Sequence, residues 1–492
     1  MICVCIGRGR HKHVMAEHAH LVEQGAKLVE LRLDYIAGEV NLKRLVKDRP
    51  GPVIISCRRQ ADGGKWTGSE DERQMLLRAA IADGVDYVDL EDDIAGSIPR
   101  FGKTKRIISM HDFSSTPEDL EDVHARMAAL DADVVKIATM ANNPHDNIRM
   151  LKLIANSKVP TVGMCMGEMG TPTRILASRF GAPFTYATFH HERSLAPGQL
   201  SYKQMTEIYN YESITPDTSV YGVIADPVGH SLSPDIHNAA FRELGINSVY
   251  VPFRVPRQDL AKFLAESESL GVRGLSVTIP HKEAVLSACK EIDPAVKGIG
   301  AANTLVFGAD GISASNTDCD AAMESLATEM RADGDKPFTG KRAVLLGSGG
   351  VVKALAFGLL DRGAAVFVAA RTPEKAKPLE KLGCKILEWD ARYSVNCDIL
   401  VNGTPIGMHP NVDDTPYDKH RLRPSMIVFD TVYNPEQTLL IKEARQKHCK
   451  TITGVDMFVR QAALQFKMFS GQDAPTQLMR EVMKRRIGPL GG

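Results

Sequence analysis

The feature that most constrains the fold is a repeat in the first 190 residues. Eight short runs rich in β-branched residues alternate with stretches such as DERQMLLRAAIADG, whose apolar residues have helical spacing. A strand–helix unit repeated in this way produces parallel strands, and eight units are the number that forms a (β/α)8 barrel. The predicted strands are ICVCIG, VELRLDYI, PVIISCRR, VDYVDLE, RIISMHDF, DVVKIATM, PTVGMCM and FTYATF.

A second α/β region is predicted after residue 209. The polar stretch YNYESITPDTSV contains Pro216 and precedes a strand predicted to begin at Tyr221, so we interpret it as a linker. Near Gly340 the sequence KRAVLLGSGGVVKALAFGLLDRGAAVFVAART has the strand, Gly-rich turn, helix and second strand of a nucleotide-binding unit. We predict an α/β protein with a TIM barrel over 1–212, a lobe over 219–325 completed by helices at about 456–488, and a Rossmann lobe over 326–455.

Composition limits the possible partners. Lys plus Arg and Asp plus Glu both total 60 in the 492 residues, so no net field draws the chain to nucleic acid or to anionic lipid. No segment approaches a membrane-spanning length. Nine cysteines without paired spacing fit reduced thiols, and the opening MICVCIGRGR resembles a strand more than a targeting peptide. We expect a cytoplasmic protein that acts on small molecules and is compatible with an oligomer.

A metal site is not predicted. The sequence contains no His/Glu or Cys/His set with ligand spacing. We interpret the remaining histidines of interest as surface or loop residues; these are His11, His13, His190 and His191.

Polar residues in the predicted barrel strands point to chemistry at the C-terminal rim, where barrel enzymes place their sites. Lys136 lies within the apolar strand DVVKIATM, where an amine that loses its proton becomes a nucleophile for a carbonyl group. A lysine that extends to solvent or pairs with a carboxylate is the alternative. His111 ends the preceding strand and would lie beside this amine as a base.

Glu30 and Arg32 alternate with apolar residues in VELRLD, and Arg58 closes PVIISCRR. These charges would point to the same rim and could hold a hydroxylated carboxylic acid. Taken one by one, they are equally compatible with a layer of ion pairs between strands.

Five separated motifs in residues 1 to about 210 resemble type I 3-dehydroquinate dehydratases, namely ELRLD, SMHDF, VVKIA, TPTRILASRFG and APGQLS. The resemblance implies that Lys136 forms a Schiff base with the substrate ketone and that His111 removes the adjacent proton. It also implies that Arg174 binds the substrate carboxylate. The substrate hydroxyls would then be held by Glu30, Arg32, Arg58 and Gln199.

Two positions depart from that family's pattern. Asp62 stands where the family usually has Glu in RxxxEGG, and Leu195 stands where Ser usually precedes APGQ. Asp62 keeps the catalytic carboxylate but reaches one methylene less far, which would loosen the orientation of His111. We therefore expect reduced or retuned activity, not loss of activity. Ser194, one place earlier, is not expected to replace the missing serine.

A nicotinamide cofactor is predicted for the second half. The GSGG turn follows the strand AVLLG and opens a helix whose backbone N–H groups could hold a pyrophosphate. The second strand ends in VAART without the Asp or Glu that would bind the ribose of NAD, which favours NADP(H). The predicted cofactor residues are Gly347, Ser348, Gly349, Gly350, Val351, Arg371, Thr372 and Lys375.

Lys282 in SVTIPHK and Asp318 in SNTDCDA each follow an apolar strand and could move a proton during carbonyl reduction. Alone, Lys282 fits a solvated loop lysine as well. Residues 220 to about 485 resemble shikimate dehydrogenases through DPVGHSLSPDIHNAAF, VTIPHKE, GAANTLV, NTDCDA, NGTPIGM, VYNP and GVDMFVRQAALQF. The resemblance implies that Lys282 and Asp318 are the catalytic pair, that Thr404 and Gly454 contact the cofactor, and that shikimate is bound by Ser231, Ser233, Thr278, Asn303, Tyr433 and Gln461.

The two resemblances together predict an enzyme that dehydrates 3-dehydroquinate and reduces the product with NADPH. One alternative is a non-catalytic quinate or shikimate sensor, which predicts damaged catalytic residues and an added DNA-binding segment; neither is visible. The other is a dehydratase fused to an NAD-dependent quinate dehydrogenase, against which Ser231, Ser233 and the residues around Arg371 argue.

Overall fold

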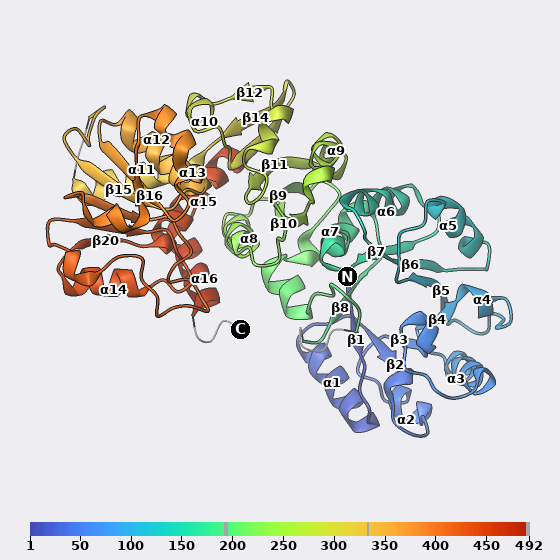
Figure 1. The fold of residues 1–492 in the computed structure, drawn as a ribbon. Coiled ribbons are helices and arrows are strands. Elements are labelled where there is room, and N and C mark those ends of the chain that lie inside the picture. The colour runs from blue at the N-terminus through green and yellow to red at the C-terminus, as the bar shows by residue number, and fades with distance from the viewer. Residues whose placement is uncertain (191–194, 332–333, 489–492) are drawn as a thin grey trace. The chain divides into compact units, whose positions relative to one another are not determined.

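The computed structural model describes residues 1–190, 195–331 and 334–488 (Figure 1). Its N-terminal part is the predicted barrel, and all eight predicted strands are present. They are all parallel and follow the order β7-β6-β5-β4-β3-β2-β1-β8, with β7 and β8 at the two ends of the ladder. The strands are β1 (Ile2–Ile6), β2 (Leu28–Arg32), β3 (Val53–Ser56), β4 (Tyr87–Glu91), β5 (Lys105–Asp112), β6 (Val134–Met140), β7 (Thr161–Met166) and β8 (Thr185–Thr188).

The strands are buried on both faces because helices cover the outside and side chains fill the inside. Local signals set the helix starts: Ser69 and Asn143 form capping boxes at α3 and α6. The helices are α1 (His11–Glu23), α2 (Leu42–Val46), α3 (Glu70–Ala82), α4 (Asp92–Ala95), α5 (Leu120–Ala128), α6 (Pro144–Asn156) and α7 (Thr171–Leu176).

The stretch interpreted as a linker is partly a packed segment. Tyr211 begins a short 3-10 turn and is fully buried, and Ile214 is buried as well. The strand expected at Tyr221 starts two residues earlier, at Ser219. The polar composition of this stretch concealed two residues, Tyr211 and Ile214, whose buried side chains fix it to the protein.

A mixed six-stranded sheet follows in the order β10-β9-β11-β13-β14-β12. Its β13–β14 hairpin is antiparallel, and β11 pairs antiparallel with β13. Its elements are β9 (Ser219–Ala225), α8 (Ser233–Glu243), β10 (Ser248–Arg254), α9 (Leu260–Glu266), β11 (Val272–Val277), β12 (Glu291–Ile292), α10 (Pro294–Ile299), β13 (Thr304–Gly308), β14 (Gly311–Ser315) and α11 (Thr317–Met330).

The last sheet is parallel with the order β17-β16-β15-β18-β19-β20, which is the strand order 3-2-1-4-5-6 of a Rossmann fold. The predicted strand, turn, helix and strand are β15, the Gly-rich turn, α12 and β16. The elements are β15 (Arg342–Leu346), α12 (Gly350–Asp361), β16 (Ala365–Ala370), α13 (Pro373–Ala376), β17 (Lys385–Glu388), β18 (Ile399–Asn402), β19 (Ile427–Asp430), α14 (Leu439–Gln446) and β20 (Lys450–Ile452).

Two C-terminal helices return to the preceding lobe. Helix α15 (Gly454–Ser470) packs against α11, and α16 (Thr476–Ile487) packs against α8. Arg486 Nε lies 2.8 Å from Asp235 Oδ1, which ties the end of the chain to the start of α8. The N-terminal and C-terminal parts of the lobe therefore form one body.

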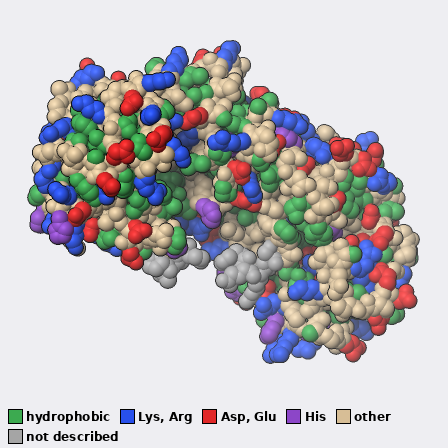
Figure 2. Space-filling model, viewed as in Figure 1, with side chains coloured by type: hydrophobic (Ala, Val, Ile, Leu, Met, Phe, Trp, Pro, Cys, Tyr) green, Lys and Arg blue, Asp and Glu red, His purple; other side chains and the backbone are tan. Residues whose placement is uncertain are grey.

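Contacts divide the chain into two compact units. The first comprises Met1–Val220, Asp226–His230 and Asn247–Gly271, and the second comprises Tyr221–Ala225, Ser231–Ile246 and Val272–Gly492. Basic and acidic side chains are intermixed over the visible face, as the equal charge totals predict (Figure 2). None of the described helices is long and apolar enough to cross a membrane.

Gly170 provides a test of packing at the entry to α7. A Cβ there would overlap the Cys165 carbonyl oxygen, so Gly170→Ala must displace the backbone between β7 and α7. We expect a loss of about 1–3 kcal/mol in the free energy of unfolding, measured by chemical denaturation. Gly96→Ala is the control, because no atom lies within 4 Å of a Cβ there. Equal stability of both variants would contradict this account of the turn.

Candidate functional sites

A cavity opens among the C-terminal ends of the barrel strands. Eight residues predicted from the sequence line it together, although they come from distant parts of the first 200 residues. Parallel strands in register bring their carboxyl ends to one rim, which explains this convergence. The eight are Glu30, Arg32, Arg58, Asp62, His111, Lys136, Arg174 and Gln199.

Lys136 lies on β6 and is buried, as the apolar strand predicted. Its Nζ lies 3.0 Å from Asp89 Oδ2 and 3.7 Å from Glu30 Oε1, and it sits 4.1 Å from the centre of the Tyr186 ring. Two carboxylates and an aromatic face therefore surround the amine. This arrangement holds a buried amine in one position at the cavity wall.

His111 lies near the end of β5 and faces the same cavity. Its Nδ1 is 3.1 Å from Arg58 Nη1, and its ring stacks on Phe113. Burial, followed by the positive charges of Arg58 and Lys136, lowers the pKa of His111 well below its usual value. The ring is therefore neutral near pH 7, which is the state required of a base.

Three buried guanidinium groups line the cavity, and within the described residues two of them have carboxylate partners. Arg32 donates to both oxygens of Asp34 at 2.9 and 2.8 Å, and Arg58 Nη2 donates to Asp89 at 2.5 Å. The ion-pair interpretation of Arg32 and Arg58 is therefore confirmed, while their contact with substrate hydroxyls stays a prediction.

Arg174 on α7 differs from these two. It is 1% exposed, and its hydrogen bonds within the described residues go to the Met164 sulfur and the Pro197 carbonyl oxygen. Burial lowers its pKa to about 10. A guanidinium buried in this way is suited to an anion that arrives from outside.

Two departures from the family pattern can be located. Asp62 lines the cavity, but its carboxylate accepts a hydrogen bond from Arg59 Nε at 2.6 Å. Leu195 also lines the cavity, and its backbone N–H donates to Gln199 Oε1 at 3.0 Å. Ser194 and His191 lie outside the described residues.

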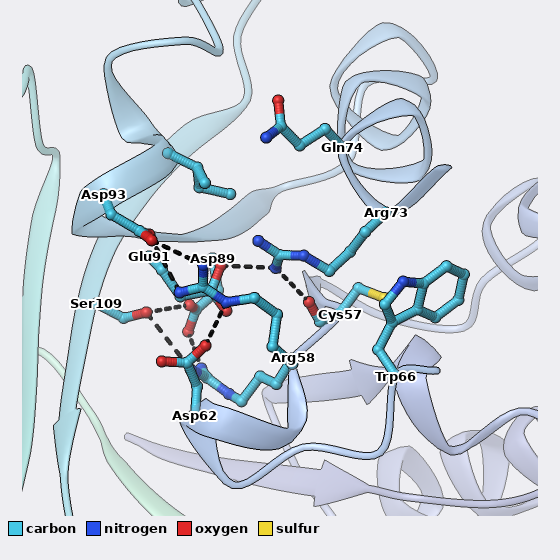
Figure 3. Close-up of polar contacts among 12 residues, drawn as sticks. Cys57, Arg58, Asp62, Trp66, Arg73, Gln74, Asp89, Glu91, Asp93 and Ser109 are labelled. Carbon is cyan, nitrogen blue, oxygen red and sulfur yellow. Dashed lines mark hydrogen bonds and ion pairs between the residues drawn. The ribbon is translucent and has the colours of Figure 1, made fainter. Parts of the chain in front are cut away.

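Sequence reasoning missed Asp89, Ser109 and Tyr186. Asp89 is buried on β4 and accepts from Arg58 and from Ser109, the latter at 2.6 Å (Figure 3). It also accepts a hydrogen bond from Lys136. Burial alone would raise the pKa of Asp89, but Arg58 and Lys136 hold it well below its usual range. The alternation in VDYVDLE, which puts Asp89 and Glu91 on one face of the strand, was the available signal.

In the second unit, Lys282 and Asp318 are brought together. Lys282 follows β11 and Asp318 is in the first turn of α11, and Lys282 Nζ donates to Asp318 Oδ2 at 2.5 Å. Both side chains are partly exposed, at 20% and 13%. A Cβ on Gly350 would lie 3.6 Å from Lys282 Cδ, so the lysine runs beside the Gly-rich turn. The pair can therefore exchange a proton close to a bound cofactor.

The other predicted shikimate contacts come from several elements of the second unit. Asn303 precedes β13 and is buried, and its side-chain oxygen accepts from the Thr317 backbone N–H at 2.8 Å. Gln461 on α15 is buried as well and donates to the Phe458 carbonyl oxygen. The remaining four are half-buried or at the start of a helix: Ser231, Ser233, Thr278 and Tyr433.

The Gly-rich turn has the backbone shape that a phosphate cradle requires. Gly347 has φ +109°, and a Cβ there would lie 3.0 Å from the Gly403 carbonyl oxygen. Ser348 separates Gly347 from Gly349, and Gly349 is the N-cap of α12. The helix begins at Gly350, and Val351 is its second residue. The first-turn N–H groups of this helix are thus available to an anion.

Three further cofactor candidates follow β16, where the chain is exposed. Arg371, Thr372 and Lys375 occupy that strand end and the start of α13. Cations and a hydroxyl in this place fit the 2′-phosphate of NADP(H) better than the ribose diol of NAD.

Thr404 follows β18, and Gly454 is the first residue of α15, which follows β20 of the same sheet. The Thr404 N–H and hydroxyl donate to Asn402 Oδ1, and Asn402 in turn donates to Asp430 Oδ1 at 3.0 Å. Burial raises the pKa of Asp430 to about 6. A Cβ on Gly454 would overlap the Val432 carbonyl oxygen, so α15 starts in close contact with the end of β19. Asn402 and Asp430, which support the Thr404 loop, were missed.

Over residues 1–190, 195–331 and 334–488, no group of three or more His, Cys, Asp or Glu side chains could hold a metal ion. His11 and His13 are in α1 rather than in a loop, and His190 is exposed.

The fold and these sites define a class: a (β/α)8 barrel with an amine-lined cavity, followed by a two-lobed dinucleotide-binding module. Three family patterns match the chain. Type I 3-dehydroquinase matches residues 2–216, shikimate dehydrogenase substrate binding domain matches 223–305, and shikimate 5′-dehydrogenase C-terminal domain matches 454–484.

A relative from Arabidopsis thaliana, named bifunctional 3-dehydroquinate dehydratase/shikimate dehydrogenase, chloroplastic, is 39% identical over 99% of this chain and 84% of its own length. A shikimate dehydrogenase (NADP(+)) from Methanopyrus kandleri is 40% identical over 56% of this chain and 98% of its own. A crystal structure of shikimate dehydrogenase in complex with NADP+ has a TM-score of 0.52 at 36% identity, over 56% of this chain and 98% of that one. The chain belongs to the family of bifunctional 3-dehydroquinate dehydratase/shikimate dehydrogenases.

The burial of Arg174 without a described carboxylate partner leads to a prediction about the stability of the protein. Arg174→Met keeps the volume and removes a desolvated charge, so we expect the free energy of unfolding without ligand to rise by about 1 kcal/mol or more. Thermal unfolding of the full chain measures this. Arg59→Met is the control, because that arginine is paired with Asp62 and Asp93 and is partly exposed. A destabilised Arg174→Met would show that the arginine serves the folded barrel rather than a ligand.

Proposed function

We propose that the chain catalyses two consecutive reactions of the shikimate pathway. The barrel dehydrates 3-dehydroquinate to 3-dehydroshikimate, and the second unit reduces 3-dehydroshikimate to shikimate with NADPH. The observation that carries the proposal is the presence, in one chain, of the Lys136–His111 cavity and of the Lys282–Asp318 pair beside a Gly-rich turn. The proposed parts keep the boundaries 1–212, 219–325 with about 456–488, and 326–455.

In the proposed first reaction Lys136 Nζ attacks the ketone carbon, and the ketone oxygen leaves as water to give an imine. The imine draws electrons from the adjacent carbon, whose proton passes to neutral His111. The protonated His111 then returns a proton to the departing hydroxyl, so a second water leaves. Hydrolysis of the imine releases the enone product and restores the amine. Arg174 binds the substrate carboxylate throughout.

The substrate hydroxyls are assigned to Glu30, Arg32, Arg58 and Gln199, which line the same cavity. Asp62 stays a candidate for orienting His111, and its ion pair with Arg59 must open for that role. This requirement gives a physical reason for retuned activity in this chain.

In the proposed second reaction Lys282 donates a proton to the carbonyl oxygen as negative charge develops there. Asp318 orients the ammonium and shares its proton through their 2.5 Å contact. NADPH, when bound, supplies the hydride. The substrate hydroxyls and carboxylate are assigned to Ser231, Ser233, Thr278, Asn303, Tyr433 and Gln461.

Cofactor binding is assigned to the Gly-rich turn, with Arg371, Thr372 and Lys375 at the 2′-phosphate and Thr404 and Gly454 on the adjoining loops. A quinate dehydrogenase that uses NAD is the second candidate for this unit, and the exposed cations after β16 argue against it. A non-catalytic sensor is the third, and it does not require the close Lys282–Asp318 contact.

A coupled assay tests both activities. Given 3-dehydroquinate and NADPH, the wild type should form shikimate, monitored by enone absorbance and NADPH loss. Lys136→Ala should form no product, because it has lost the nucleophile. Lys282→Ala should accumulate 3-dehydroshikimate, with its reduction slowed by about 10²–10⁴-fold.

Lys105→Ala is the matched control, because Lys105 is an exposed lysine at the start of a barrel strand. Quinate with NAD is assayed beside shikimate with NADP+. Binding without turnover in the wild type would favour the sensor, and faster quinate oxidation with NAD would favour the quinate dehydrogenase.

The cofactor assignment is tested by Arg371→Ala. We expect KM for NADPH to rise about tenfold or more, while KM for NADH stays nearly unchanged, because only NADPH carries the phosphate. Lys385→Ala, in the neighbouring strand β17, is the control. An equal rise for both cofactors would overturn the assignment of Arg371 to the 2′-phosphate.

A further inference from the structure

We propose that Asp89 sets the geometry of both reacting side chains in the barrel, holding Lys136 directly and fixing the tautomer of His111 through Arg58. The inference rests on the proposed dehydratase function. Asp89 lies beneath the cavity and is not among the residues that line it. It therefore acts through other residues and is a positioning residue.

The contacts of Asp89 form a chain that leads to each reacting group. Asp89 Oδ2 accepts from Lys136 Nζ at 3.0 Å and from Arg58 Nη2 at 2.5 Å, while Oδ1 accepts from Ser109 Oγ at 2.6 Å. The carboxylate is 2% exposed, so these bonds are made in a medium of low dielectric. Both of its oxygens are thus engaged, and neither Lys136 nor Arg58 can turn without breaking a buried bond.

The second nitrogen of the Arg58 fork fixes the proton on His111. With Nη2 held by Asp89, Nη1 lies 3.1 Å from His111 Nδ1. A guanidinium has only donors, so Nδ1 must be the acceptor in this contact. In the neutral ring the proton is then on Nε2.

This tautomer has a consequence for the base. The nitrogen able to take a proton is Nδ1, and a buried cation faces it. His111 can therefore accept the substrate proton only after Arg58 Nη1 releases Nδ1. Because Arg58 lines the cavity, a bound substrate hydroxyl offers Nη1 another acceptor. The base becomes available when substrate is present.

Glu91 offers a matched comparison two residues along β4. It is also buried, but it accepts from Arg73, which in turn donates to the Cys57 carbonyl oxygen (Figure 3). Glu91 thus lies on the same strand as Asp89 and is also buried and negatively charged. The two differ in their partners, because the cation that donates to Glu91 is Arg73, whereas Lys136 and Arg58 donate to Asp89. Asp89→Asn and Glu91→Gln remove the same charge with little change in volume.

The tautomer is measured first, on the substrate-free full chain with ¹⁵N-labelled histidine. The His111 signals are assigned by their loss in His111→Gln. We expect a two-bond ¹H–¹⁵N spectrum with an unprotonated Nδ1 and a protonated Nε2 in the wild type and in Glu91→Gln. In Asp89→Asn the two tautomers should mix. A wild-type ring protonated on Nδ1 would overturn the proposal.

The second measurement follows the imine by reduction with borohydride in the presence of 3-dehydroquinate. We expect trapping on Lys136 to slow by about tenfold or more in Asp89→Asn, with KM changed less than kcat, and to stay near wild type in Glu91→Gln. Equal trapping in both variants would overturn the proposal. If Asp89→Asn does not fold, Ser109→Ala, which removes only the bond to Oδ1, must slow trapping by a smaller factor for the proposal to stand.

The two measurements separate this inference from the proposed function. If the wild type forms no trappable imine, the dehydratase assignment fails, while the tautomer of His111 in the free enzyme is still measured. If the wild type forms imine but its ring is protonated on Nδ1, the dehydratase assignment stands and the role of Asp89 is wrong.

Discussion

Charge compensation inside the barrel is the constraint on which the dehydratase site depends. A lysine and two arginines of the cavity wall are buried together, and each would be costly in an apolar core. Asp89, Glu30 and Asp34 offset these charges through contacts of 2.5 to 3.7 Å. The carboxylates lie on or just after strands β2 and β4, so the barrel itself fixes where each cation can lie.

The charge of Arg174 is not compensated in this way, and this difference leaves the cavity with one positive charge that has no carboxylate partner among the described residues. The other two guanidinium groups are tied to carboxylates, whereas Arg174 has weak neutral partners in the described part of the chain. A site that compensated every cation would have little attraction for an anionic substrate. In the proposed function, the uncompensated cation costs stability in the free protein and attracts the substrate carboxylate.

The candidate site of the second unit depends more on the shape of its backbone than on buried charges. Gly347, Gly403 and Gly454 allow three loops to approach closely at the carboxyl edge of the Rossmann sheet. Lys282 comes to that edge from the other lobe of the same unit. The two proposed reactions are joined by their chemistry, since the enone formed in the barrel is the ketone that the second unit reduces.

The sequence by itself determined the elements and most of the charged residues that line the barrel cavity. The period of the apolar runs gave eight strands because a buried parallel strand must be apolar on both faces, and the Gly-rich turn gave the Rossmann unit. Lys136, His111, Lys282 and Asp318 could be identified because an ionisable side chain within or next to an apolar strand is costly to bury and therefore indicates a function.

Tertiary structure decided which groups pair. Asp89 is one of 60 acidic residues in the chain, and only the register of β3, β4, β5 and β6 places it against Arg58, Ser109 and Lys136. Tyr211 likewise lies in a stretch that its sequence predicts to be a linker, and only the folded structure shows that its side chain is buried. Pairing across strands depends on distances that local sequence does not encode, so the partners of the reacting groups emerged only from the folded chain.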